Sequence, residues 1–174
     1  MKKRILCSVF AFLMFILCSC SHAVIANEPV TFYYPWADLL SVMKQNPDCN
    51  SIGSEDRDIS GDRSSLSYVL SLYFLGPQDA ALISPFPDGT STISTQLNGS
   101  TLTLTLTPTF AQLKGIDRTI ACTCLAKTCF DMTGVDIIVI EAAMADPLNA
   151  VHISITRDNY LLTDTTLETI PTTE

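Results

Sequence analysis

The chain has 174 residues, 47% of them hydrophobic, and its 18 acidic residues exceed its 10 basic residues to give a formal net charge of −8 at pH 7. This length fits one folded domain, or two at most. The acidic balance argues against binding to nucleic acid and against electrostatic adhesion to anionic lipid head groups.

The N-terminus has the pattern of a signal peptide. A basic Lys-Lys-Arg start is followed by an almost wholly apolar run from Ile5 to Leu17. Such a run is too short and too one-sided for a membrane-spanning helix, and it matches the apolar region of an export signal. We therefore assign residues 1–19 to a signal peptide.

The signal ends in Leu17-Cys18-Ser19-Cys20, which resembles a bacterial lipobox. The resemblance implies cleavage before Cys20, transfer of diacylglycerol to that cysteine, and a tether over residues 20–29 on the extracytoplasmic face of the cell membrane. Several acyl chains hold a protein on a membrane stably. Cleavage removes three basic residues and no acidic one, so the mature charge becomes −11. The alternative is ordinary cleavage after Ala26.

Four cysteines lie outside the signal region: Cys49, Cys122, Cys124 and Cys129. If the last three share a helix, Cys122 and Cys129 are about 10 Å apart along its axis, beyond the roughly 7 Å Cα limit for a disulfide. Cys122 and Cys124 then point to nearly opposite faces. The spacing also lacks the paired C-x2-C units of a zinc site. We expect small buried hydrophobic residues, with one bridge to Cys49 or a metal site as the alternatives.

The first part of the domain is predicted as a strand, a short helix and a loop. Val30–Tyr34 has the composition of a strand, which Pro35 ends, and Trp36–Met43 could form one or two helical turns. The polar stretch 44–61 is predicted as a long surface loop. Within it, residues 56–61 resemble the first half of a calcium-binding loop. The twelfth position of such a loop requires a glutamate, and here it is occupied by Ser67. We therefore prefer a solvated acidic turn before the next helix.

A helix capped by Asp62 or Ser64 is predicted next, because apolar residues recur at helical spacing and Gly76-Pro77 stops the pattern. These residues are Leu66, Val69, Leu70, Tyr73 and Phe74.

A β-hairpin is predicted over Ser91–Thr107, with Asn98-Gly99 as a two-residue turn. This turn pairs Leu97 with Ser100 and Thr95 with Leu102. Because side chains alternate along a strand, an apolar set then lies on one face and the threonines lie on the solvent-exposed face. The apolar set is Ile93, Leu97, Leu102, Leu104 and Leu106.

The last third is predicted to contain a helix, a central strand and an edge strand. Ile116, Ile120, Cys124 and Leu125 have the spacing of an amphipathic helix ended by Gly134. Val135–Ile140 is a continuous apolar run, and Val151–Ile155 alternates. Residues 163–174 are predicted as a frayed tail.

The order of elements is β-α-β-β-α-β. One apolar hairpin face and two amphipathic helices predict an α+β domain, a two-layer α/β sandwich with the helices on one face of the sheet.

Three stretches in order resemble the GerM domain of bacterial sporulation and spore germination lipoproteins: Tyr68–Pro77, Ser84–Thr90, and Phe110–Asp117 with Thr119 and Cys124 following. The resemblance covers residues 30–162. It implies a fold similar to ring-building motifs, no catalytic activity, and assembly with envelope or sporulation-complex proteins or with further copies of the chain. The chain departs from the family in fitting one domain where members often carry two, and in replacing a Thr-Leu-Thr core by residues 122–128.

No catalytic, cofactor or metal site is predicted. His22 lies two residues after the expected anchor at Cys20, and His152 falls on the wet side of an edge strand. Nucleophile-elbow, zinc-protease and phosphate-loop motifs are absent from the sequence. Lys127 is the sole basic neighbour of the cysteines, too little to create a reactive thiolate.

Three functions follow as hypotheses: a membrane-tethered assembly scaffold, a ligand-binding or germinant-sensing lipoprotein, and a hydrolase. The first agrees with the family resemblance and the lack of reactive groups. The second requires an apolar pocket with convergent polar groups, and the third a catalytic constellation.

Overall fold

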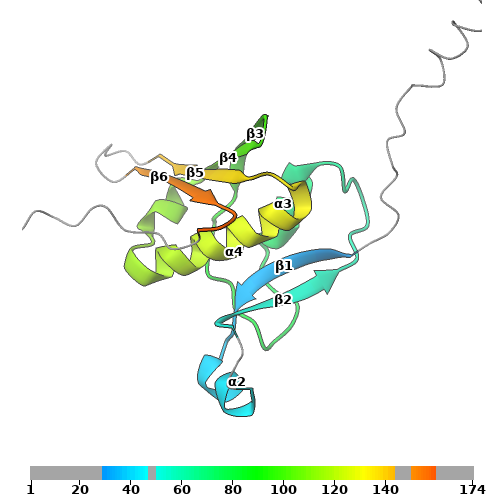
Figure 1. Cartoon of the computed structure of the whole chain (residues 1–174), viewed down its shortest axis with the longest axis vertical. Coiled ribbons are helices and arrows are strands. Elements are labelled where there is room, and N and C mark those ends of the chain that lie inside the picture. Colours follow the sequence, from blue (N-terminus) through cyan, green and yellow to red (C-terminus); the bar gives the residue numbers. More distant parts are fainter. Residues whose placement is uncertain (1–28, 47–49, 144–149, 160–174) are drawn as a thin grey trace, which may run out of the picture.

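The computed structural model of this chain describes residues 29–46, 50–143 and 150–159 (Figure 1). Over these residues the fold is mixed α+β, with two sheets and three α-helices. The elements in order are β1 Val30–Pro35, α2 Leu39–Gln45, β2 Ile52–Arg57, α3 Leu66–Tyr73, β3 Thr92–Asn98, β4 Thr101–Leu106, the 3₁₀ helix η1 Pro108–Gln112, α4 Gly115–Thr133, β5 Ile137–Ala142 and β6 Val151–Thr156.

The predicted surface loop over 44–61 is wrong, because it contains strand β2. The predicted order β-α-β-β-α-β is therefore incomplete, because the α-helices and strands of the described residues follow the order β-α-β-α-β-β-α-β-β. This strand pairs antiparallel with β1 to form a separate two-stranded ribbon. Its sequence, Ile-Gly-Ser-Glu-Asp-Arg, has little intrinsic strand preference, so pairing and packing hold it. Gly53 illustrates the packing: a Cβ there would lie 2.7 Å from Leu82 Cδ2 and 2.8 Å from the Trp36 ring. The sequence does not distinguish a glycine that close packing requires, such as Gly53, from a glycine in a loop.

The second sheet has four strands in the order β3-β4-β5-β6. Strands β4 and β5 are parallel, and the other two pairs are antiparallel. Parallel neighbours need a crossover, which η1 and α4 supply here. The predicted central strand is confirmed as β5, and the predicted edge strand as β6.

The predicted hairpin forms, but its register is shifted by two residues. Leu97 lies opposite Leu102 instead of Ser100, and Thr95 opposite Leu104. The turn residues are Gly99 and Ser100, with Gly99 at φ +59° in the first central position, where both favoured hairpin turns need a positive φ. The Ser100 carbonyl accepts hydrogen bonds from the backbone N–H groups of Asp136 and Ile137, so a tertiary contact holds this turn.

The face assignment holds for β4 and fails in part for β3. Leu102, Leu104 and Leu106 are buried, and none of the threonines between them is. On β3, however, Ile93 is 62% exposed and Leu97 is 67% exposed. Ile93 falls at a bulge between Thr92 and Ser94, which reverses the alternation at the start of the edge strand. Thr92, predicted on the wet face, instead pairs with Leu106, and its Oγ1 is buried with no hydrogen-bond partner among the described residues.

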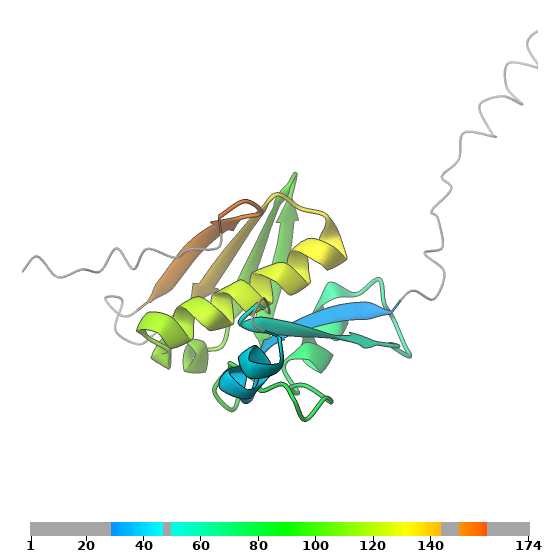
Figure 2. The ribbon, with the colours of Figure 1, turned by 60° about the horizontal axis from the view of Figure 1, so that its bottom comes forward.

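Helix α4 is covered on two sides. Figure 2 shows it crossing the four-stranded sheet, with the β1–β2 ribbon lying beside it. The backbone N–H of Tyr33 on β1 donates to Thr128 Oγ1 of α4 at 3.1 Å. This arrangement explains why Cys122 and Cys124 are both buried although they point to nearly opposite sides of the helix.

The helix ends follow local chemistry with one shift. Helix α3 is capped by Ser65, whose side chain accepts from the Tyr68 N–H, instead of by Asp62 or Ser64. Gly134 ends α4 in the left-handed conformation, as predicted. Ile116 is 70% exposed, so the first turn of α4 lies outside the core.

Aromatic side chains join the ribbon, α3 and the following loop. The Tyr73 ring stacks on Tyr34 with a centroid distance of 4.8 Å and contacts the edge of Phe86 at 5.4 Å. Two hydrogen bonds fix it: Tyr34 Oη donates to the Tyr73 carbonyl, and Tyr73 Oη donates to the Tyr33 carbonyl. The two sheets therefore share one hydrophobic core.

Candidate functional site

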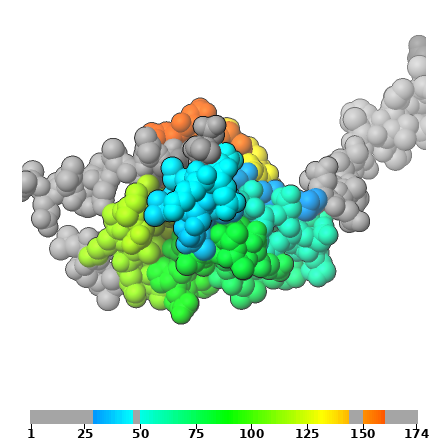
Figure 3. Space-filling model, turned by 90° about the horizontal axis from the view of Figure 1, so that it is seen from below, coloured from blue at the N-terminus to red at the C-terminus, as the bar shows by residue number. Residues whose placement is uncertain are grey.

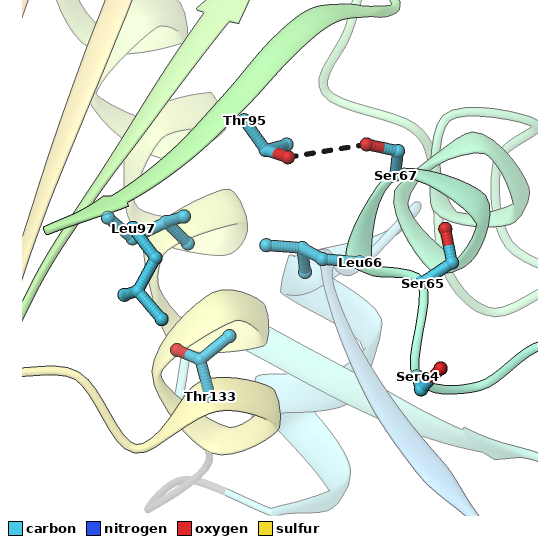
Figure 4. Close-up of a pocket in the computed structure, with 8 residues that line it drawn as sticks. Ser64, Ser65, Leu66, Ser67, Thr95, Leu97 and Thr133 are labelled. Atoms are coloured by element: carbon cyan, nitrogen blue, oxygen red, sulfur yellow. Dashed lines mark hydrogen bonds between the residues drawn. The ribbon is translucent and has the colours of Figure 1, made fainter.

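A shallow hollow of about 490 Å³ opens where α3 begins, β3 runs and α4 ends (Figure 4). The start of α3 contributes Ser64 to Ser67, and Ser67 Oγ lies 3.3 Å from Thr95 Oγ1 on β3. Leu66, Leu97 and Leu102 form its apolar wall, and Thr133 lies at the end of α4. The lining combines hydroxyl groups with aliphatic side chains and contains no ionisable group.

The hollow adjoins the open edge of the four-stranded sheet. Strand β3 is the outermost strand, and its sequence Thr-Ile-Ser-Thr-Gln-Leu-Asn has no charge and no proline. Edge strands are usually protected by charges, prolines, bulges or covering elements. Here β3 has the bulge at Ile93, and helix α3 packs against it, with Ser67 Oγ 3.3 Å from Thr95 Oγ1. The exposed end of β3 around Leu97 is therefore the part of this edge beside which an extended polypeptide has room to lie.

A nearly buried ion pair ties the ribbon to the loop after α3. Glu55 and Arg57 of β2 pair with each other, and each side chain is 9% exposed. Arg57 also donates to the carbonyls of Leu72 and Gly76, while Glu55 accepts from the backbone N–H groups of Gln78 and Asp79. The guanidinium lies 4.9 Å from the centre of the Phe32 ring. We call Glu55 and Arg57 the β2 clamp. Its contacts hold β2 against α3 and the loop that follows α3.

Sequence reasoning missed the β2 clamp because it lay in the predicted loop. The signal was present: residues two apart on a strand point to one side, and here those residues have opposite charges.

The cysteine thiols of α4 are unreactive because they are buried. Cys122, Cys124 and Cys129 are buried and free, as small hydrophobic residues would be. Burial raises the pKa of each thiol to about 12. Almost no thiolate therefore exists near neutral pH, and a nucleophilic role requires thiolate. Cys49 lies outside the described residues.

His152 lies where the alternation predicted, on the solvent side of β6. Its side chain is 71% exposed, and its Nδ1 is 3.1 Å from Glu141 Oε1. An exposed histidine beside one carboxylate has neither a positioned nucleophile nor a water-excluding cleft around it.

Residues 56–61 form neither the calcium loop that their sequence imitates nor the solvated acidic turn that we predicted in its place. Asp56 belongs to β2, pairs with Thr31, and accepts a hydrogen bond from the Thr31 hydroxyl at 2.7 Å. The first of the expected oxygens therefore lies on a paired strand, while Asp58 and Ser60 follow the strand and are exposed. Across the described residues no group of three His, Cys, Asp or Glu side chains could hold a metal ion.

The predicted lipid acceptor Cys20, most of the tether 20–29, His22 and the tail 163–174 lie outside the described residues. Within the described part of the chain, every helix is too short or too polar to cross a membrane.

Comparison with known proteins finds no matching family model, no matching curated protein and no matching solved structure.

Proposed function

We propose that this protein is an exported lipoprotein, anchored through Cys20 on the extracytoplasmic face of the cell membrane, whose domain is a non-catalytic assembly module. In this proposal the domain is GerM-like, with a two-layer sandwich related to ring-building motifs, and it serves sporulation or spore germination. The motifs at Tyr68–Pro77 and Ser84–Thr90 and the lipobox support the proposal.

The open edge of β3 is the observation that carries the assembly role. Its exposed Leu97 adjoins the hollow, and β3 has a neighbouring strand, β4, on one side alone. Strand addition obtains affinity from backbone hydrogen bonds and specificity from side-chain pockets. The partners are envelope proteins or further copies of this chain.

The test uses the full-length protein extracted from its native membranes. Chemical crosslinking followed by mass spectrometry should identify protein partners or self-crosslinks at β3. Leu97→Lys should reduce these crosslinks at least tenfold, because a lysine at the hollow must lose solvation on pairing. Leu75→Lys is the matched control, since Leu75 is 81% exposed in the loop after α3. A wild-type chain that enriches no protein and does not self-associate refutes the assembly role.

The anchor is tested separately by intact mass. The mature chain should begin at Cys20 and carry diacylglycerol, and Cys20→Ala should abolish both the cleavage and the lipid. A mature chain that begins at Asn27 contradicts the anchor.

The hollow favours a second candidate function, a ligand-binding or germinant-sensing lipoprotein. Its volume lies in the range of small-molecule sites. Its lining suits a small, partly apolar molecule that accepts hydrogen bonds from hydroxyl groups. Leu66→Trp should fill the hollow, so a compound that raises the Tm of the wild-type protein should leave the Tm of this variant unchanged. Equal stabilisation of both would exclude the hollow as the binding site.

A further inference from the structure

Helix α2 is an apolar helix without a buried face. Its seven residues, Leu-Leu-Ser-Val-Met-Lys-Gln, include four large apolar side chains, yet none is buried. Leu40 is 72% exposed and Met43 is 43% exposed. The helix has a complete N-cap, because Asp38 accepts from both the backbone N–H and the hydroxyl of Ser41. Its start is therefore formed by local bonds, while Leu40 and Met43 remain exposed and Leu39 and Val42 are half-buried.

Two apolar neighbours lie beside the start of α2. The Ala37 N–H donates to the Ala81 carbonyl and the Ile83 N–H donates to the Pro35 carbonyl, so the segment 81–83 lies beside the start of α2. Ile83 is 53% exposed. Trp36, the single tryptophan of the chain, is half-buried and donates its indole N–H to the Asn50 carbonyl at 2.8 Å. We call Trp36, Leu40, Met43 and Ile83 the α2 surface; α2 projects from the middle of the face seen in Figure 3.

We infer that the α2 surface rests on the lipid bilayer to which the chain is anchored. This inference rests on the proposed anchor at Cys20. Ten residues separate Cys20 from Val30, which span at most about 33–36 Å when extended. Strand β1 covers about 20 Å between Val30 and the end that leads into α2. The anchor can therefore stay in the bilayer while α2 touches the same bilayer.

The chemistry of the surface fits lipid better than a charged partner. Lys44 is the one charged residue of α2, and the chain as a whole is acidic, so attraction to anionic head groups does not drive the contact. Aliphatic side chains beside a tryptophan are the composition of a segment that lies in the membrane interface. An anchored chain also meets the bilayer at high effective concentration, so a contact too weak to bind a free protein suffices.

Trp36 is the natural reporter for the test. The full lipidated chain is reconstituted into phosphatidylcholine vesicles with or without bromine on the acyl chains, and tryptophan emission is recorded. We expect brominated lipid to quench Trp36 emission at least twofold. The double variant Leu40→Ser, Met43→Ser should still float with the vesicles and lose most of this quenching. Ile93→Ser is the matched control, because Ile93 is 62% exposed on β3, which lies at the end of the molecule opposite α2 (Figure 1), and the quenching of this variant should equal that of the wild type.

The outcomes separate the inference from the anchor. A wild-type chain that floats with the vesicles while its Trp36 emission is unquenched overturns the inference and leaves the anchor intact, as does equal quenching in wild type and double variant. A chain that carries no lipid and does not float overturns the anchor and the inference together. Shielding of Trp36 from aqueous acrylamide only when another protein is present would assign the α2 surface to a protein partner instead.

Discussion

At the scale of single residues, Arg57 connects several parts of the molecule, and no sequence motif indicated this role. It bonds to Glu55 on its own strand and to two carbonyls of α3 and the following loop, while lying near the Phe32 ring. A charge that is 9% exposed is stable only while its partners remain. The β2 clamp thereby gives a polar segment a fixed place.

Replacing Arg57 should therefore cost more than replacing the pair. Arg57→Met leaves the Glu55 carboxylate buried without a countercharge, and we expect a loss of about 3–5 kcal/mol in the free energy of unfolding. The double variant Glu55→Gln, Arg57→Met should recover part of that loss. Urea unfolding measures both, with the exposed Lys44→Met as the control. A loss for Arg57→Met no larger than for Lys44→Met would show that the clamp is not important for stability.

At the scale of elements, the β3–β4 hairpin depends on the glycine of its turn. Gly99 has φ +59°, and a Cβ built there meets no atom within 4 Å. The requirement for glycine is thus one of backbone conformation and not of space.

Substitutions at Gly99 should rank by their tolerance of a left-handed backbone. Gly99→Val should lower the free energy of unfolding by about 1–2 kcal/mol, and Gly99→Asn by clearly less, because asparagine adopts this conformation more readily. Thermal unfolding of the two variants compares them directly. Equal losses would mean that the strain is relieved by movement of the turn.

At the scale of the whole molecule, burial of weak acids in the shared core makes stability depend on alkaline pH. Burial raises the pKa of Cys122, Cys124 and Cys129 to about 12 and raises the pKa of Tyr34 and Tyr73 above their ordinary value of 10. The folded chain therefore keeps protons that the unfolded chain releases.

Stability should be unaffected by these groups below about pH 8 and should fall as pH rises through 9 and beyond. Each group that titrates only in the unfolded chain contributes a slope of about 1.4 kcal/mol per pH unit. Urea midpoints between pH 7 and 10.5 measure the slope. Cys124→Ala should reduce this slope whatever its stability at pH 7. A midpoint independent of pH would contradict the burial of these groups.

Prediction from the sequence succeeded where local chemistry and periodicity were sufficient. The helix over Leu66–Tyr73, the glycine cap at Gly134 and the alternation of buried leucines along β4 were all anticipated. It failed where a distant contact decided the outcome. The hairpin register depends partly on Asp136 and Ile137 bonding to Ser100, and β2 depends on β1, on the loop after α3 and on a glycine under Trp36.

The features of the candidate site also differ in whether the sequence could predict them. The prediction of no catalytic site came from the sequence alone, because reactive motifs depend on local spacing. The hollow beside β3, the open edge and the unburied α2 surface come from segments far apart in sequence, and alternation wrongly placed Ile93 and Leu97 inside. The sequence by itself determined the elements whose stability is local and the burial pattern within β4. Only the tertiary structure decided which strands pair and which apolar side chains stay exposed, because pairing and coverage depend on neighbours that no local pattern identifies.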